Sequence, residues 1–377
     1  MNQVQQQAYP TGSWHPAETD VSRETLEETT ELPRVMVDSE NHYVVQPLPP
    51  EQELAPPRDG DNPAPRRAVA PGTGTGAAVA RPQAEPLPRP THTRVFVVAN
   101  QKGGVGKTTT AVNLAVALAQ GGLRVVVLDL DPQGNASTAL GVEHRMGVRG
   151  SYEVLLQSDS IAQDLVVSSE DERVLVLPAT LDLAGAEIEL VSQVAREKRL
   201  DKALKAYLKQ HDVDYVLIDC PPSLGLLTVN ALVAANEILL PIQCEYYALE
   251  GVSQLVRTIE LVKGDLNDGL VLSTVLLTMF DSRTRLASQV ADEVRSHFSA
   301  QTLNTVIPRS VRISEAPSYG QSVLTYDPGS VGSRTYRAAA AEIAWRGAAP
   351  GTAPGTSQGT TQVTTQGQTG PRLTATS

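Results

Sequence analysis

Short apolar runs alternate with longer amphipathic stretches between residues 94 and 347. The runs are too short for helices and too continuously apolar for strands with one wet face, so they predict strands buried in a parallel sheet. The expected strands are Val95–Ala99, Val125–Leu130, Val174–Leu177, Tyr215–Asp219, Ile238–Ile242 and Val271–Thr278. Helices are expected at Thr109–Gln120, Leu183–Gln210 in two pieces, Leu226–Ala235, Leu249–Lys263, Leu286–Phe298 and Val331–Trp345. This alternation predicts an α/β fold, a mostly parallel twisted sheet with helices on both faces.

The two ends of the chain lack this alternation. Residues 1–93 hold 15 of the 26 prolines, and the last 30 residues are rich in Thr, Gly and Gln. Such segments bury too little apolar surface to offset the entropy of ordering the chain. We therefore predict a disordered Pro-rich extension at 1–93, one folded domain at 94–347 and a disordered tail at 348–377.

The formal net charge is −11, and acidic residues outnumber basic ones 13 to 7 in residues 1–93. A protein of this charge has no overall attraction for nucleic acid, so DNA binding would need a local basic patch. Residues 281–347 supply a candidate, because they contain eight arginines and six acidic residues.

Cys220 and Cys244 are the only cysteines, and they do not form a CxxC pair. No charged-then-apolar signal segment opens the chain, and the most apolar stretch, Ala231–Ile242, is interrupted by Asn236 and Glu237. These features predict a soluble, cytoplasmic protein that does not span a membrane.

A glycine-rich loop follows the first predicted strand and precedes a helix. It consists of Lys102, Gly103, Gly104, Val105, Gly106, Lys107, Thr108 and Thr109. Glycines let backbone N–H groups turn toward phosphate oxygens, and the following helix N-terminus adds its dipole. Lys107 is expected to reach the β and γ phosphates and Thr108 to bind Mg²⁺. The loop predicts a single P-loop NTPase domain.

Two further predicted strands end in carboxylates. Alternation along the strand places Asp129 and Asp131 on one side, with Asp131 nearer the edge where ligands bind. Asp131 is the candidate for activating the attacking water, although it could instead order a Mg²⁺-bound water. Asp219 ends an apolar strand and is the expected acidic partner of Mg²⁺.

The loop departs from the usual G-x-x-x-x-G-K-[ST] pattern, because Gln101 replaces the first glycine and Lys102 follows it. In this it resembles the deviant P-loop ATPases, and residues 94–347 are similar to chromosome-partition ATPases of the ParA or Soj type. The resemblance implies ATP and Mg²⁺ as cofactors and an ATP-bound homodimer in which Lys102 touches the partner's nucleotide. A surface lysine at the start of a loop is the other interpretation of Lys102.

The resemblance also assigns roles in the arginine-rich segment. It implies that Arg283 and Arg312 contact DNA without reading its sequence, and that Pro308 and Arg309 lie against the adenine. Arginine suits phosphate because its planar fork donates two hydrogen bonds. The alternative is that Arg283 or Arg312 only forms an ion pair with Asp281 or Glu315.

The resemblance implies a slow ATPase that drives segregation of the chromosomal origin. ATP would join two subunits, the dimer would bind nonspecific DNA at the nucleoid, and a ParB-type centromere-binding partner would stimulate hydrolysis. The extension at 1–93 would be a tether or a docking segment for a polar or positioning protein.

Two other classes remain open. A membrane-associated positioning ATPase like MinD needs a C-terminal amphipathic helix, and the Thr-, Gly- and Gln-rich end has no apolar face. An electron-transfer ATPase like the nitrogenase iron protein needs cluster-binding cysteines in glycine-bearing loops, whereas Cys220 and Cys244 follow predicted strands.

Overall fold

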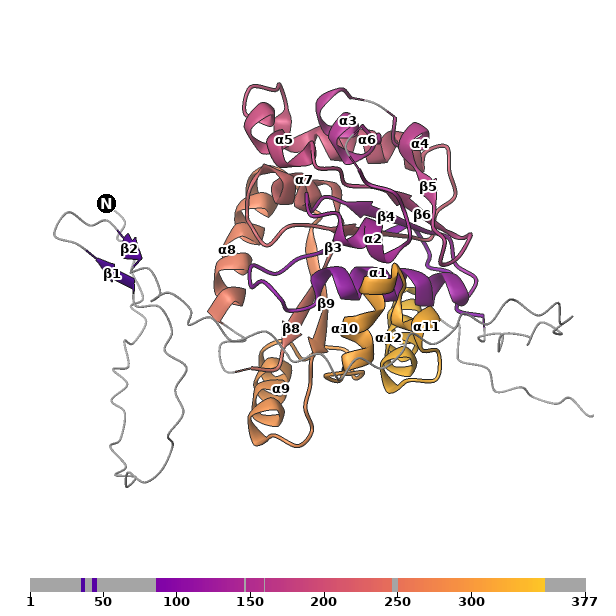
Figure 1. Ribbon diagram of the computed structural model, residues 1–377, viewed down its shortest axis with the longest axis vertical. Coiled ribbons are helices and arrows are strands. Elements are labelled where there is room, and N and C mark those ends of the chain that lie inside the picture. The colour runs from indigo at the N-terminus through magenta and orange to yellow at the C-terminus, as the bar shows by residue number, and fades with distance from the viewer. Residues whose placement is uncertain are drawn as a thin grey trace, which may run out of the picture. The chain divides into compact units, whose positions relative to one another are not determined.

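The computed structural model describes residues 86–349 except 146, 159 and 246–249, together with two three-residue strands near the N-terminus (Figure 1). These strands, β1 (Val35–Val37) and β2 (Tyr43–Val45), pair antiparallel and belong to a separate unit, Met1–Ala77. They were not predicted from the sequence. The expected disorder is wrong for residues 86–93, which contact the folded core, and the rest of the expected disordered ends, apart from β1, β2 and 348–349, lies outside the described residues.

A seven-stranded sheet forms the centre of the second unit. Its strands are β3 (Arg94–Val98), β4 (Val125–Asp129), β5 (Val166–Val167), β6 (Val174–Leu177), β7 (Tyr215–Asp219), β8 (Glu237–Gln243) and β9 (Val271–Thr278). They lie in the order β5-β6-β4-β7-β3-β8-β9, and only the edge strand β5 runs antiparallel to its neighbour. The carboxyl ends of β3, β4 and β7 therefore meet at one edge, where ligands of open α/β sheets bind.

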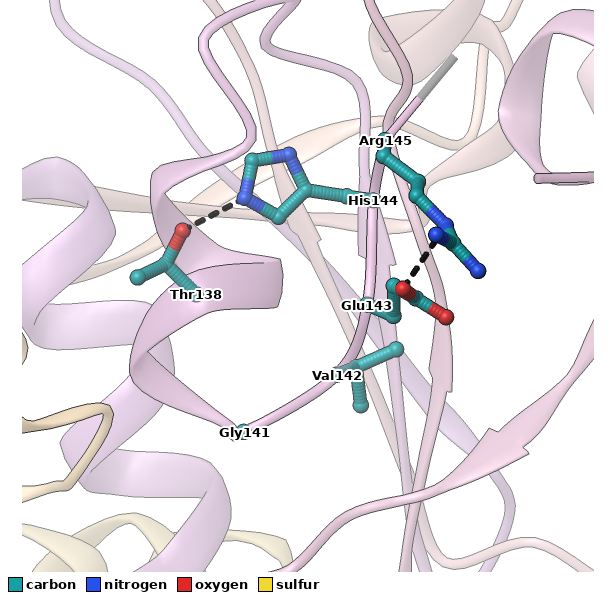
Figure 2. Close-up of a pocket in the computed structure, with 6 residues that line it drawn as sticks. All are labelled: Thr138, Gly141, Val142, Glu143, His144 and Arg145. Atoms are coloured by element: carbon teal, nitrogen blue, oxygen red, sulfur yellow. Dashed lines mark hydrogen bonds and ion pairs between the residues drawn. The ribbon is translucent and has the colours of Figure 1, made fainter. Parts of the chain in front are cut away.

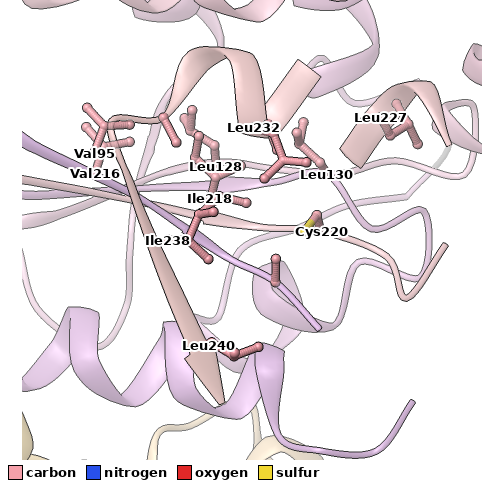
Figure 3. Close-up of a cluster of buried hydrophobic side chains, with 14 of the residues drawn as sticks. Val95, Leu128, Leu130, Val216, Ile218, Cys220, Leu227, Leu232, Ile238 and Leu240 are labelled. Atoms are coloured by element: carbon pink, nitrogen blue, oxygen red, sulfur yellow. The ribbon is translucent and has the colours of Figure 1, made fainter. Parts of the chain in front are cut away.

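In the six parallel strands, alternate side chains enter two separate apolar clusters, whereas both side chains of the edge strand β5 are exposed. Val95 and Val97 face one cluster, whereas Phe96 and Val98 face the other. Figure 3 shows the first cluster, where Leu128 and Ile218 pack with side chains of a covering helix. Burial on both faces explains why the strands are continuously apolar in sequence.

Helices cover both faces. The first cluster is covered by α3 (Ser151–Leu156), α5 (Leu183–Leu190), α6 (Arg199–Leu208), α7 (Leu226–Ala234), α8 (Glu250–Asp265) and α9 (Arg285–His297). The second is covered by α1 (Lys107–Gln120), α2 (Asn135–Ala139), α10 (Val311–Glu315), the 3-10 helix η2 (Ala316–Tyr319), α11 (Val323–Tyr326) and α12 (Val331–Gly347). Short elements α4 (Ile161–Asp164) and η1 (Arg196–Lys198) complete the unit. Figure 1 shows α1 beside α11 and α12.

The predicted mostly parallel sheet with helices on both faces is confirmed. All six predicted strands are present, with ends that shift by one residue at most. The predicted helices are also present, and Leu183–Gln210 does contain two pieces. The sequence did not predict β5 or the helices of four to six residues, because so short an element shows no full period of apolar spacing.

Residues 86–93 belong to the second unit and pack against its core. Leu87 donates a backbone hydrogen bond to the Gly121 carbonyl at 2.9 Å, and Pro90 forms an isolated antiparallel bridge with Ala348. Arg89 pairs with Asp214 at 2.7 Å and with Asp212 at 3.1 Å. The predicted domain start at residue 94 therefore omits a segment that contacts the core, and the three-part division itself stays a prediction.

Candidate nucleotide site

The glycine-rich loop connects β3 to α1 in a conformation that requires glycine. Gly104 and Gly106 have φ of 75° and 88°, in the left-handed region that side chains with a Cβ avoid. A Cβ placed at Gly103, Gly104 or Gly106 would meet no atom within 4 Å. No side chain caps the start of α1. Its first N–H groups thus remain available beside an open cradle, which fits an anion such as phosphate.

Two buried polar side chains fix the loop to the sheet. Asn100 donates to the Pro241 carbonyl at 2.8 Å and accepts from the Lys102 N–H at 3.0 Å. The Thr278 hydroxyl, at the end of β9, donates to the Val105 carbonyl at 2.9 Å. Sequence reasoning did not single out Asn100 or Thr278, although Asn100 directly follows one predicted strand and Thr278 ends another at this edge.

Lys107 is the first residue of α1 and is only 8% exposed. Within the described residues its ammonium forms no hydrogen bond or ion pair. The Asp219 carboxylate attracts it without forming a hydrogen bond or ion pair, so an anionic ligand in the loop would supply a direct partner.

Asp219, at the end of β7, is fully buried, and neither carboxylate oxygen accepts a hydrogen bond from any described residue. Burial and the neighbouring Asp129 carboxylate raise its pKa well above the ordinary value, and the nearby Thr108 hydroxyl opposes that rise. An unpartnered buried carboxylate beside a hydroxyl matches the oxygen ligands that magnesium prefers. These residues therefore fit a Mg²⁺ ion held by Thr108 and, through water, by Asp219.

Asp129 and Asp131 have different environments. Asp129 is fully buried and accepts hydrogen bonds from the N–H and hydroxyl of Ser137, at 2.8 and 2.7 Å, and from the Asp131 N–H. Burial is the main cause that raises its pKa to about 6. Asp131 lies farther toward the edge, is 9% exposed and accepts from the Gln133 N–H at 3.0 Å. Asp129 thus organises the turn before α2, while Asp131 keeps an oxygen free for other contacts.

Lys102 and Arg309 meet at a residue that the sequence did not indicate. The Glu245 carboxylate lies 3.7 Å from the Lys102 ammonium and 2.9 Å from the Arg309 guanidinium. The sequence could have indicated Glu245, because its carboxylate comes two residues after β8, at the same edge of the sheet as the loop. Pro308 forms an isolated parallel bridge with Phe280, two residues beyond the end of β9. The structure therefore brings Arg309 close to the glycine-rich loop.

Arg283 and Arg312 are exposed but paired with acidic residues. Arg283 makes two hydrogen bonds of 2.9 Å to Asp281, and its side chain is 86% exposed. Arg312 lies 3.2 Å from Glu315 and 3.5 Å from Asp327. Both arginines thus form, in the single chain, the ion pairs that the sequence analysis gave as the alternative to DNA contact. Exposed pairs of this kind contribute little stability, so a phosphate could replace either carboxylate.

A cavity of about 420 Å³ lies outside these residues, beyond the end of α2 (Figure 2). Its lining includes His144, whose Nε2 is 2.7 Å from the Thr138 hydroxyl, and a Glu143–Arg145 ion pair of 2.8 Å. The cavity is wide open and contains none of the predicted site residues. The sequence did not indicate it.

Both cysteines are buried, and burial raises the pKa of Cys220 to about 12 and that of Cys244 to about 11. In the described residues no group of three or more His, Cys, Asp or Glu side chains could bind a metal ion without other ligands. None of the helices in the described residues has the length and hydropathy needed to cross a membrane.

An open left-handed glycine loop and a buried lysine at the helix start define a P-loop nucleotide-binding protein, together with an aspartate at the end of the adjacent strand that accepts no hydrogen bond from a described residue. The comparisons agree with this class. A family model described as an AAA domain matches residues 93–272.

Closely similar proteins extend over nearly the whole described unit. The chain is 50% identical over 254 residues to the sporulation initiation inhibitor protein Soj of Bacillus subtilis, a match that covers 67% of this chain and 99% of that protein. It is 51% identical over 253 residues to the chromosome partitioning protein ParA of Myxococcus xanthus, covering 67% and 88%. The chain belongs to the ParA/Soj family of chromosome-partitioning P-loop ATPases.

Solved structures share the fold. A Mycobacterium smegmatis protein named cobyrinic acid a,c-diamide synthase, with bound ADP and magnesium, is 40% identical with a TM-score of 0.57, covering 66% of this chain and 93% of that one. The cell division ATPase MinD of Pyrococcus furiosus is 27% identical with a TM-score of 0.55, covering 66% and 98%. The higher identity to Soj and ParA favours the partition branch over MinD.

Proposed function

We propose that this protein is an ATP-gated switch that binds nonspecific DNA and drives segregation of the chromosomal origin. ATP and Mg²⁺ bind at residues 102–109, with Mg²⁺ held by Thr108 and Asp219. The observation that carries the proposal is the buried Asp219 carboxylate, which lies beside the open glycine loop and accepts no hydrogen bond within the described part of the chain. The solved relative with bound ADP and magnesium supports this assignment.

Hydrolysis in this proposal depends on positioning and on charge. Lys107 neutralises the β and γ phosphates, Lys102 contacts the nucleotide of a second subunit, and Asp131 orients the attacking water. Pro308 and Arg309 contact the adenine. Because Lys102 acts across the interface, loss of the γ phosphate removes its partner and releases the dimer.

The dimer holds DNA through Arg283 and Arg312. A ParB-type centromere-binding protein stimulates the otherwise slow hydrolysis, and the dimer releases the DNA. The protein thus resides at the nucleoid, and the extension at 1–93 is a tether or a docking segment for a polar or positioning protein. The 50% identity to Soj and the exposed ion pairs of the two arginines support this sequence of events.

A gel-shift experiment with duplex DNA of arbitrary sequence tests the proposal. The unaltered protein should retain DNA with ATP but not with ADP. Lys102→Ala should abolish ATP-dependent dimerisation and retention, and Arg312→Ala should abolish retention while the dimer persists. Arg145→Ala, which removes another exposed arginine that is paired with a glutamate, is the matched control and should bind like the parent.

Salt dependence provides a second measurement. Retention should weaken steeply between about 50 and 200 mM salt, and loss of one phosphate contact should reduce the slope by roughly one unit. A Lys102→Ala protein that still dimerised and retained DNA would contradict the switch. Co-sedimentation with anionic liposomes in the presence of ATP, without DNA binding, would instead favour a MinD-like positioning ATPase.

A further inference from the structure

Three charged side chains from distant parts of the chain meet at the end of β8. The Glu245 Oε1 atom accepts a hydrogen bond of 2.9 Å from Arg309, and its Oε2 atom lies 3.7 Å from the Lys102 ammonium. The Gln243 side-chain amide donates to Oε1 at 2.5 Å. One carboxylate therefore neutralises two cations while a neighbouring amide orients it.

Hydrogen bonds to the backbone fix the segments that carry Lys102 and Arg309. The Lys102 N–H is tied through Asn100 to the Pro241 carbonyl of β8, the strand that Glu245 follows. The Arg309 N–H donates to the Phe280 carbonyl at 3.0 Å, next to the end of β9. The contact between Lys102 and Glu245 thus follows from fixed positions of the sheet and not only from the reach of two flexible side chains.

On the basis of the proposed function, we propose that Glu245 is a positioning residue that holds Lys102 on its own subunit and competes for it with the phosphates of a second subunit. The side chains of Lys102 and Glu245 are 35% and 44% exposed. An exposed pair at 3.7 Å is weak, so a more highly charged anion replaces the carboxylate readily. ATP supplies that anion in its γ phosphate, whereas ADP lacks it.

Glu245 consequently determines how strongly dimerisation discriminates ATP from ADP. Removal of its charge leaves Lys102 free to reach any nearby phosphate. Arg309 loses its acidic partner in the same step. Arg309, which is assigned to the adenine, and Lys102, which is assigned to the partner's phosphates, are therefore released together. No other described residue forms an ion pair with Lys102.

Sedimentation of the full chain with Mg²⁺ and either ADP or a non-hydrolysable ATP analogue tests this role. Glu245→Gln keeps the shape of the side chain and removes its charge. With the ATP analogue, its half-dimerisation concentration should fall about two- to fivefold, as expected for loss of an exposed ion pair. With ADP, the variant should form dimer at concentrations where the parent is monomeric. Glu245→Asp retains the charge and should lie closer to the parent.

Glu172→Gln is the matched control, since Glu172 is an exposed acid remote from the loop and its loss changes the net charge equally. An equal shift in Glu172→Gln would overturn the proposal, because net charge would then explain the effect. An unchanged or higher half-dimerisation concentration for Glu245→Gln, with a parent that dimerises normally, would overturn the role of Glu245 alone. A parent that stays monomeric with the ATP analogue would overturn both this role and the proposed switch.

Discussion

At the scale of single residues, Asp219 shows how a ligand site costs stability. Its carboxylate is fully buried without a hydrogen-bond partner in the described residues, and nearby carboxylates repel it. Such a group persists only where a ligand supplies the compensating charge. The neighbouring Lys107 has the opposite charge but forms no ion pair with it within the described residues.

Asp219→Asn should therefore separate stability from function. We expect the nucleotide-free variant to be as stable as the parent or more stable by about 1–3 kcal/mol, because a buried unpaired charge is removed. The stabilisation by Mg²⁺ and ATP should be lost. Thermal unfolding with and without Mg-ATP measures both effects, and Asp268→Asn, at an exposed position, is the control. A variant less stable than the parent that kept its Mg-ATP shift would contradict this interpretation.

Asp129 gives a prediction of pH dependence. Its pKa is about 6 in the folded chain and lies above its ordinary value of 3.8, because burial disfavours the charged form. Its contribution to stability is therefore fully present below about pH 4 and is lost as the pH rises through about 6. Groups with lowered pKa values, such as Asp281 at about 2, contribute with the opposite sign.

The prediction is best measured as a difference between the parent and Asp129→Asn. Chemical unfolding at several pH values between about 4 and 7 should give a parent-minus-variant free energy that falls as the pH rises. Contributions from Asp281 and other distant groups cancel in this difference. Asp129→Asn also removes a charge that raises the pKa of Asp219. This second effect makes the parent-minus-variant free energy fall with pH as well. A difference that rose with pH would contradict the assigned cause.

At the scale of elements, the turn before α2 directly follows Asp131 in the chain and contacts His144, a residue that lines the cavity. Gly134 precedes α2 with φ of 62°, and a Cβ there would lie 2.5 Å from the His144 ring. The His144 side chain in turn contacts Thr138 of the same helix. The turn therefore needs glycine both for its backbone angle and for the close approach of the imidazole.

Gly134→Ala should destabilise the protein by about 1–2 kcal/mol from the left-handed backbone alone, and by more from the contact with His144. A double-mutant cycle with His144→Ala separates the two effects, because the lost contact between His144 and Thr138 is common to both His144→Ala proteins and cancels in the cycle. Denaturant unfolding of the four proteins provides the free energies. Additive effects of the two substitutions would show that the imidazole does not restrict the turn.

At the scale of the whole molecule, the segment before β3 belongs energetically to the folded unit. Leu87 packs against the second apolar cluster, and Arg89 bridges to Asp212 and to the buried Asp214. The bridge between Pro90 and Ala348 places both ends of the described unit side by side.

Two truncations test where the folded unit begins. Removal of residues 1–85 should leave the free energy of unfolding unchanged, whereas removal of 1–93 should lower it by about 1–3 kcal/mol through lost burial of Leu87 and lost pairing of Arg89. Arg89→Gln in the full chain should account for only part of that loss, because Leu87 remains in place. Equal stability of both truncated proteins would support a start at residue 94.

The sequence alone predicted the sheet, because six strands buried on both faces must be continuously apolar, and each is found within one residue of its expected ends. It also predicted the glycine loop with Lys107, whose residue types have no packing role after a buried strand. Elements as short as β5 and α2 were missed, since only their tertiary neighbours stabilise them. The roles assigned to Arg283 and Arg312 stay predictions.

Only the tertiary structure decided which charges meet. Lys102, Glu245 and Arg309 are separated by more than 60 residues from one another in the chain, and no periodicity joins them. They meet because parallel strands bring the ends of β3, β8 and β9 to the same edge of the sheet. Local patterns determine elements through burial and backbone geometry, whereas electrostatic partners depend on distances that only the folded sheet sets.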